Sequence, residues 1–174
     1  MLFQCITRNR VAGSLKTFVN FIIRYSTDRI FTKPMTSAKD KQFEVTKTEQ
    51  EWRETLTPEQ FYVLRKHGTE RAGTSPLDKN YANGTYICAG CGNPLFKSAT
   101  KFNSGTGWPS FFDPIEGAIE TTVDRSFFMT RVEVHCARCG GHLGHVFNDG
   151  PAPTGQRYCM NGVSLEFEPQ AENG

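Results

Sequence analysis

The chain has 174 residues, a length that suits one domain with a single core and a tail. Its net charge of +2 argues against bulk nucleic-acid binding, and no apolar run approaches the roughly 18 to 20 residues that span a bilayer. With 14 Phe and 16 Gly, the composition favours a compact, turn-rich β protein with aromatic packing over a helical bundle.

The first 27 residues are basic and rich in hydroxyl side chains, and they contain no Asp or Glu. Asn20 and Arg24 interrupt the apolar run of roughly 7 to 15 residues that a secretory signal requires. The composition therefore predicts a mitochondrial transit peptide over residues 1–27 and a location in the matrix, with an ordinary disordered tail as the alternative. Residues 28–46 are polar and are interpreted as a linker, in which Met35 offers an internal start for a cytosolic form.

Two capping motifs predict two short helices at the beginning of the remaining domain, residues 47–170. Thr48 followed by Glu51 forms a capping box. The stretch 57–60 (Thr-Pro-Glu-Gln) is a stronger signal, because it combines an N-cap Thr with Pro at the first helical position. This second helix is expected to end at Gly68.

Strand signals follow the helices. The tight-turn dipeptide at 83–84 (Asn-Gly) leads into a strand at 86–88, and the stretches 131–136 and 164–167 alternate apolar with polar side chains. Turns rich in Gly and Pro separate these stretches. The sequence thus predicts a mainly β fold in which short N-terminal helices are followed by antiparallel sheets.

Two Cys-x-x-Cys motifs, each followed at once by glycine, predict a metal site. Four thiolates can surround Zn²⁺ at about 2.3 Å, and such a closed site is structural because it leaves no position for water. Two disulfides or two redox dithiols are the alternatives. Disulfides are unusual in a mitochondrial or cytosolic protein, and thioredoxin-type chemistry uses a single such motif at a helix start. The four expected zinc ligands are Cys88, Cys91, Cys136 and Cys139.

Cys159 is the one cysteine of this domain outside the two motifs, and its surroundings favour a nucleophile over inert packing. Arg157 lies two residues earlier, on the same face if this segment is a strand, and a nearby cation favours the thiolate. Asn161 lies on that face too, and His142 and His145 follow the second Cys-x-x-Cys motif. One free Cys with histidines and an Asn forms a nucleophile constellation. A pair of solvated surface histidines is the alternative.

Three longer motifs resemble the methionine-R-sulfoxide reductase (MsrB/SelR) family. They are residues 104–111 (Ser-Gly-Thr-Gly-Trp-Pro-Ser-Phe), the run Cys-x-x-Cys-Gly-Gly-His-Leu-Gly-His-Val-Phe from Cys136, and Arg-Tyr-Cys-x-Asn from Arg157. The resemblance extends from about Thr48 to Pro169. It implies a pair of antiparallel sheets in a β-tent-like arrangement, with short helices and a structural zinc on the side away from the active site.

The resemblance also implies an activity, the repair of oxidised proteins by a peptide-methionine (R)-S-oxide reductase. A thiolate attacks the sulfoxide sulfur while an acid protonates the oxygen, which leaves a sulfenic acid that another thiol can reduce. In the bound R epimer, the methyl group packs on an aromatic wall while the oxygen faces the histidines. The implied catalytic positions are the nucleophile Cys159, the acid or polarising His145, His142 and Asn161. The implied substrate-binding positions are the aromatic wall Trp108, with Arg157 and Asp149 around the thiol and histidine.

The chain departs from the family pattern at Thr106, where many relatives carry a cysteine that resolves the sulfenic acid. Cys5 is a poor replacement, because it lies in the predicted transit peptide. We therefore expect an external thiol, thioredoxin or another reductant, to attack Cys159 directly, and we expect a monomer that binds neither nucleic acid nor membrane. Two other classes remain open at this point: a zinc-stabilised β-fold ligand-binding module without catalysis, and a thiol–disulfide oxidoreductase. The missing resolving partner disfavours the latter.

Overall fold

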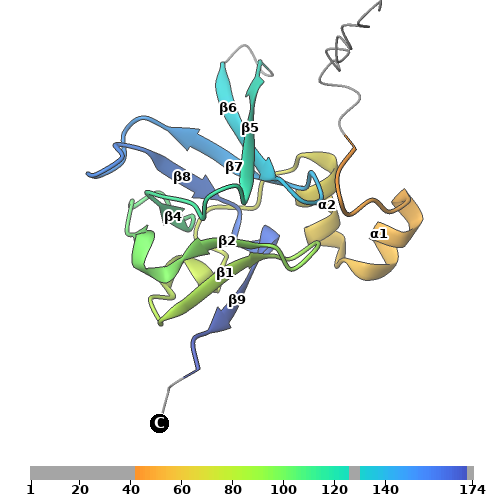
Figure 1. The fold of residues 1–174 in the computed structure, drawn as a ribbon, viewed down its shortest axis with the longest axis horizontal. Helices are drawn as coiled ribbons and strands as arrows, with labels where there is room; N and C mark the ends of the chain where they lie inside the picture. Colours follow the sequence, from red (N-terminus) through yellow and green to blue (C-terminus); the bar gives the residue numbers. More distant parts are fainter. Residues whose placement is uncertain (1–41, 126–129, 172–174) are drawn as a thin grey trace, which may run out of the picture. The chain divides into compact units, whose positions relative to one another are not determined.

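The computed structural model describes residues 42–125 and 130–171, and it has the expected mainly β fold (Figure 1). Two short helices accompany a three-stranded and a six-stranded antiparallel sheet, which confirms the predicted fold class. The predicted transit peptide, Cys5, Met35 and most of the predicted linker lie outside the described residues. Within the described part of the chain, no helix is long and apolar enough to cross a membrane.

Both predicted helices are present and begin at the predicted caps. Helix α1 covers Glu49–Thr55 and α2 covers Pro58–Lys66. At the start of α1, the Thr48 hydroxyl accepts a hydrogen bond from the Glu51 N–H, and the Glu51 carboxylate accepts one from the Thr48 N–H at 2.7 Å. Thr57 caps α2 in the same way. These reciprocal bonds satisfy N–H groups that the first turn of a helix leaves without partners.

Helix α2 ends at Lys66, and its left-handed residue comes one position before the predicted Gly68. His67, not Gly68, adopts the left-handed conformation, with φ of 55°. Gly68 is required for another reason: its N–H donates to the Tyr62 carbonyl at 3.0 Å, and a Cβ at this position would collide with the Tyr62 ring. His67 tolerates the left-handed conformation better than a bulky or β-branched residue would. The side chain of His67 consequently reaches the outer face of the large sheet.

The small sheet has the strand order β2-β1-β9, formed by Pro94–Lys97, Gly84–Cys88 and Leu165–Pro169. Gly84 is not the turn residue that the sequence suggested, because it is already the first residue of β1. A Cβ at Gly84 would meet the backbone of β9, so the glycine permits close approach of two strands.

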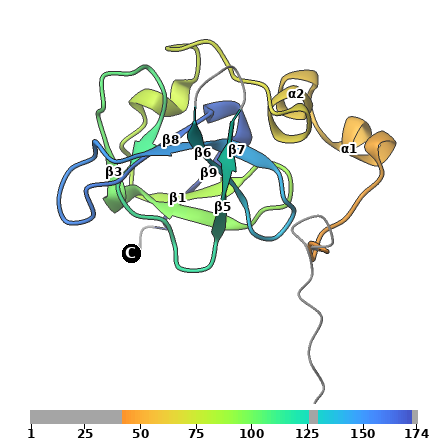
Figure 2. The same ribbon diagram turned by 90° about the horizontal axis from the view of Figure 1, so that it is seen from above.

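The large sheet has the strand order β3-β4-β8-β7-β6-β5, whose strands are labelled between Figure 1 and Figure 2. The sequence predicted β6 with its observed bounds, but it gave no clear signal for β3, β4, β5 or β7. The strands are β3 Lys101–Phe102, β4 Ser110–Phe111, β5 Ile119–Asp124, β6 Arg131–Cys136, β7 His142–Phe147 and β8 Arg157–Met160. Short 3₁₀ helices cover η1 Pro76–Lys79, η2 Ser98–Thr100 and η4 Gly162–Ser164.

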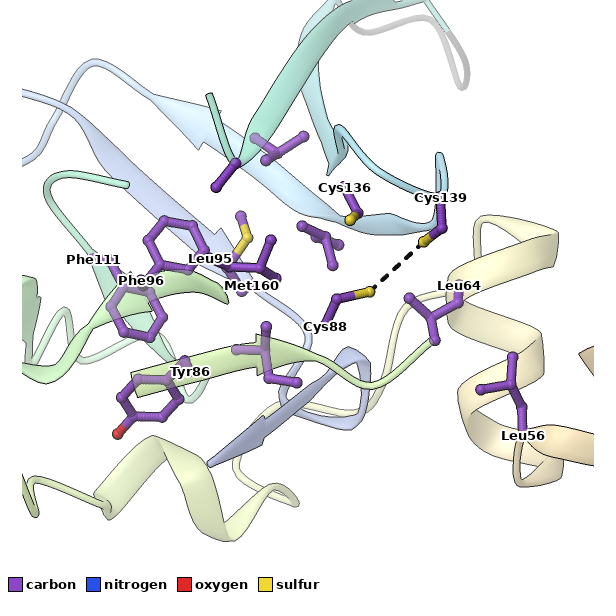
Figure 3. Close-up of a cluster of buried hydrophobic side chains, with 14 of the residues drawn as sticks. Leu56, Leu64, Tyr86, Cys88, Leu95, Phe96, Phe111, Cys136, Cys139 and Met160 are labelled. Carbon is purple, nitrogen blue, oxygen red and sulfur yellow. Dashed lines mark hydrogen bonds between the residues drawn. The ribbon is translucent and has the colours of Figure 1, made fainter. Parts of the chain in front are cut away.

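Aromatic side chains join the two sheets (Figure 3). Phe96 of the small sheet stacks on Phe111 of the large sheet with ring centroids 4.3 Å apart, and Tyr86 meets Phe111 edge-on at 4.9 Å. Tyr158 of β8 also faces this cluster, with its ring 5.9 Å from that of Phe96. Successive side chains of a strand point to opposite faces, so Cys159 leaves the large sheet on the face away from this core.

Candidate active site and zinc site

The four predicted metal ligands come from two turns, one between β1 and β2 and the other between β6 and β7. Their sulfur atoms all lie within 4.8 Å of one another, with Cys88 Sγ 3.8 Å from Cys139 Sγ and Cys91 Sγ 3.6 Å from Cys136 Sγ. Zinc–sulfur bonds of about 2.3 Å place tetrahedral sulfurs about 3.8 Å apart, whereas a disulfide needs about 2.05 Å. The four cysteines therefore form a structural zinc site, as the sequence predicted.

The zinc site joins α2 to both turns. Leu64 of α2 lies beside the sulfurs of Cys88 and Cys139 (Figure 3), and the Arg65 guanidinium donates to the Cys139 carbonyl at 3.1 Å. Strand β7 begins three residues after Cys139. The metal therefore fixes the start of the strand that carries the candidate histidines.

A row of polar side chains crosses the outer face of the large sheet. In the antiparallel register, Cys159 lies directly opposite Ser110 on one side and opposite His145 on the other. His145 in turn lies opposite Glu133. Residues paired in this way project from the same face of a sheet. Backbone pairing alone therefore places the thiol next to an imidazole.

A register shift adds His142 to this face. Strand β7 has one residue more than β6 where β6 passes from Val134 to His135. In a regular strand, residues three apart point to opposite faces, and a bulge re-aims one of them. His142 Nδ1 lies 2.7 Å from Glu133 Oε1, and the His142 ring is 5.4 Å from the His145 ring. Burial by itself would raise the pKa of Glu133, but hydrogen bonds from the histidines outweigh it and hold that pKa well below its usual range.

A cavity of about 130 Å³ opens beside Cys159. It brings together four of the predicted site residues, whereas His142, Arg157 and Asp149 do not line it. A larger recess of about 790 Å³ lies between α2 and β9, but its lining contains neither Cys nor His. We therefore take the smaller cavity as the candidate active site. It is lined by Thr69, Trp108, Arg131, Gly144, His145, Phe147, Cys159, Met160 and Asn161.

Glu70, which no motif in the sequence singled out, connects two walls of this cavity. The Trp108 Nε1–H donates to the Glu70 carbonyl at 3.2 Å, and the Glu70 N–H donates to Asn161 Oδ1 at 3.0 Å. The Asn161 Nδ2 donates to the Leu143 carbonyl at 3.0 Å, so both ends of this buried amide are held by backbone. Trp108 and Asn161 are thus oriented by one short segment that follows α2.

Comparison with known proteins identifies the family. The SelR domain model matches residues 56–169, more than half of the chain. The chain belongs to the SelR family. The resemblance inferred from the three sequence motifs is confirmed.

Relatives of this SelR protein cover nearly the whole domain. The peptide methionine sulfoxide reductase MsrB of Methanosarcina barkeri is 57% identical over 129 residues, 74% of this chain and 91% of the relative. The MsrB of Leptospira interrogans is 54% identical over 127 residues, with coverage of 72% and 97%, respectively. That of Agrobacterium fabrum is 56% identical over 126 residues, with coverage of 72% and 93%.

Burial favours the protonated form of the Cys159 thiol of this SelR domain. Burial raises the pKa of Cys159 and outweighs the opposing contributions of Thr106, Arg157 and Ser110. The Arg157 guanidinium is engaged by Asp149, with Nε–Oδ1 of 2.8 Å and Nη2–Oδ2 of 3.0 Å. The cation expected to favour the thiolate is therefore present, but the effect of burial on the pKa of Cys159 outweighs it.

Burial favours the neutral form of His145, the imidazole of the SelR domain that lies opposite this thiol. Burial lowers the pKa of His145, although the hydrogen bond with Asp124 opposes the shift. His145 Nε2 lies 3.1 Å from Asp124 Oδ2, and the Arg131 guanidinium donates to the same oxygen at 2.8 Å. Because Asp124 engages Nε2, the nitrogen that remains for a ligand or a proton is Nδ1.

Proposed function

We propose that this protein reduces the R epimer of methionine sulfoxide in peptides and proteins, with Cys159 as the nucleophile. The reaction class follows from the SelR family and from relatives that are peptide methionine sulfoxide reductases. The observation that carries the assignment to residues is the cavity in which Cys159 lies opposite His145, with Trp108 and Asn161 in its walls. A ligand-binding module without catalysis would need neither the thiol nor its imidazole neighbour.

The proposed chemistry uses the thiol and the imidazole as one unit. Cys159 Sγ attacks the sulfoxide sulfur, and the thiol proton passes through His145 Nδ1 to the sulfoxide oxygen. The protonated oxygen then moves from the substrate sulfur to Cys159 Sγ: the sulfur–oxygen bond of the substrate and the transient bond between the two sulfur atoms break, and a new Sγ–oxygen bond leaves Cys159 as a sulfenic acid. Methionine is the two-electron reduced product, and the cysteine sulfur is oxidised by the same two electrons. The structural zinc takes no part in these steps.

Selectivity for one epimer follows from two walls of different character. The indole of Trp108 offers an apolar surface for the methyl group, whereas the His145 side offers a polar group for the oxygen. The sulfoxide sulfur is tetrahedral and carries the methyl group, the oxygen, the rest of the side chain and a lone pair. When the protein fixes the positions of the methyl group, the oxygen and the attacking thiol, only one of the two epimers fits. His142 does not line the cavity, and we assign it the role of orienting His145, whose ring it contacts.

We further propose that an external thiol, thioredoxin or another reductant, regenerates Cys159. Among the described residues, the only cysteines besides Cys159 are the four zinc ligands. Thr106 stands where many relatives carry a resolving cysteine, and its Oγ1 is 3.9 Å from Cys159 Sγ. Comparison of the full chain with its Cys5→Ser variant tests the internal alternative, because loss of thioredoxin-supported turnover would contradict this proposal.

The location proposed is the mitochondrial matrix, supported by the basic, acid-free composition of residues 1–27. A fusion of residues 1–46 to a fluorescent protein tests it: import into mitochondria with cleavage supports a transit peptide, and diffuse cytosolic signal contradicts it. A start at Met35 would produce the cytosolic form. We expect the mature protein to be a monomer, which light scattering after size exclusion can measure.

The nucleophile is tested by one turnover without added reductant. Pre-reduced, zinc-loaded protein is mixed with an excess of a peptide that contains methionine-R-sulfoxide. The proposal predicts one methionine per protein molecule and a gain of one oxygen atom on the peptide that carries Cys159, read by mass spectrometry. An oxygen atom on any other residue, or continued turnover without reductant, would refute the assignment.

A further inference from the structure

A second cluster of metal-ligating side chains lies beside the active site. One ring nitrogen of His67, one of His142 and a carboxylate oxygen of Glu133 all lie within 4.8 Å of one another. Glu133 Oε1 is 2.9 Å from the His67 nitrogen and 2.7 Å from the His142 nitrogen. The three side chains come from the end of α2, from β6 and from β7, so the fold, not the local sequence, brings them together.

The donor set is one that zinc uses in proteins. Two imidazole nitrogens and one carboxylate oxygen leave a fourth tetrahedral position for water. With bonds of about 2.0–2.1 Å, ligand atoms around zinc lie about 3.3 Å apart. The present separations at Glu133 would have to widen by roughly 0.5 Å, which side-chain rotation can supply. An ion would replace the two protons that the Nδ1 atoms now share with this carboxylate.

The surroundings favour binding from solvent. The His67 side chain is 64% exposed, whereas the side chains of Glu133 and His142 are 15% and 3% exposed. The largely buried side chains of Glu133 and His142 are thus joined by the exposed side chain of His67, which an ion from solvent can reach first. The Thr122 hydroxyl donates to Glu133 Oε2 at 3.1 Å and so directs Oε1 toward the histidines. Partners of this kind orient the ligands of metal sites.

We propose that His67, Glu133 and His142 form a second zinc site, distinct from the four-cysteine site, at which zinc inhibits the enzyme. The inhibitory part rests on the proposed function. An ion on His142 Nδ1 fixes this ring, which contacts His145, and it adds positive charge next to the imidazole that must accept the thiol proton. Both effects oppose proton transfer from Cys159.

Binding is tested separately from activity. Zn²⁺ is titrated calorimetrically into Cys159→Ser protein whose four-cysteine site is already loaded, so that the thiol cannot act as a ligand. The proposal predicts that one further zinc ion binds and that His67→Gln weakens this event by about tenfold or more. Glu120→Gln is the matched control, because it breaks a different His–Glu pair, with His135 at 3.5 Å, and should leave zinc binding unchanged. If no further zinc ion binds, or if the His67→Gln variant binds it with the same affinity, the proposed site is refuted.

Inhibition is measured in the single turnover described above, in a buffer without chelators or thiols. Each protein is normalised to its own rate without added zinc. Zinc should slow the wild type, and His67→Gln should need about tenfold more zinc for the same effect. Equal inhibition of both proteins would overturn the inhibitory role, because zinc would then be acting at Cys159. A protein without reductase activity would refute the proposed function, yet the calorimetric experiment would still report on the site.

Discussion

Cys159 of β8 lies directly opposite His145 of β7 in the antiparallel register of the large sheet. Cβ atoms of such pairs are about 4.5–5.5 Å apart and project from the same face. Burial raises the pKa of the thiol and lowers that of the imidazole, so both shifts favour a pair that holds a single proton, on sulfur. One proton on the pair is also what the proposed reaction requires.

The rate of a single turnover should therefore have a broad pH plateau. On the acid side, protonation of His145 removes the proton acceptor, so the rate falls below the ordinary imidazole pKa of about 6.5. On the alkaline side, ionisation of Cys159 removes the proton, so the rate falls above the ordinary thiol pKa of about 8.5. His145→Gln should slow the reaction by about 10²–10⁴-fold. A rate that rises steadily to high pH would show that the thiolate alone limits the reaction.

Removal of zinc should unfold the domain. Structural zinc contributes about 10–16 kcal/mol in small domains, as much as the whole stability of about 5–15 kcal/mol of a typical domain. A strong chelator should therefore release one zinc ion and abolish cooperative thermal unfolding and activity together, although the metal performs no chemistry. Circular dichroism and a colorimetric zinc assay measure both effects. Retention of a sharp melting transition in the zinc-free protein would contradict this account of the fold.

Thr106→Cys should convert the enzyme to one that resolves its own sulfenic acid. The Thr106 hydroxyl is already 3.9 Å from Cys159 Sγ, within the range that side-chain rotation can close to a disulfide. After one turnover, mass spectrometry should detect a disulfide between positions 106 and 159 in place of the sulfenic acid. Thr106→Ser is the control and should keep the sulfenic acid. A stable sulfenic acid in Thr106→Cys would mean that the two side chains cannot meet.

Glu70 should act as a positioning residue. Its carboxylate accepts hydrogen bonds from the N–H groups of Gly162 at 2.6 Å and Val163 at 3.0 Å, directly after Asn161. Glu70→Ala leaves both part-buried donors without their acceptor, at a cost of up to about 1–3 kcal/mol each. We expect KM for the sulfoxide to rise about tenfold or more with a smaller change in kcat, and Glu70→Gln to restore part of the loss. An equal fall of kcat in both variants would point to a role in the chemistry itself.

Local signals in the sequence were sufficient to predict the two helices and the zinc site. The caps at Thr48 and Thr57 depend on neighbours three residues away, and each Cys-x-x-Cys motif forms one turn. The long motifs around Trp108 and Cys159 were sufficient to identify the family. Alternation of apolar and polar residues identified β6, but β7 escaped because its bulge breaks that pattern.

The supporting residues of the site could not be read from the sequence. Glu133, Asp124 and Glu70 are ordinary acidic residues until the strand register and the segment after α2 place them against the histidines, Trp108 and Asn161. Nor could charge spacing predict the resting state of Cys159. Arg157 is close, as expected, but the burial that outweighs it is a property of the folded sheet.

The central claim, a cysteine-based reductase that selects one epimer, is tested most directly with separated R and S epimers of a peptide methionine sulfoxide. Dithiothreitol serves as the reductant, and wild type is compared with Cys159→Ser at equal zinc content. We predict turnover of the R epimer alone by the wild type and of neither epimer by the variant. Turnover of the S epimer, or R turnover that survives in Cys159→Ser, would contradict the account.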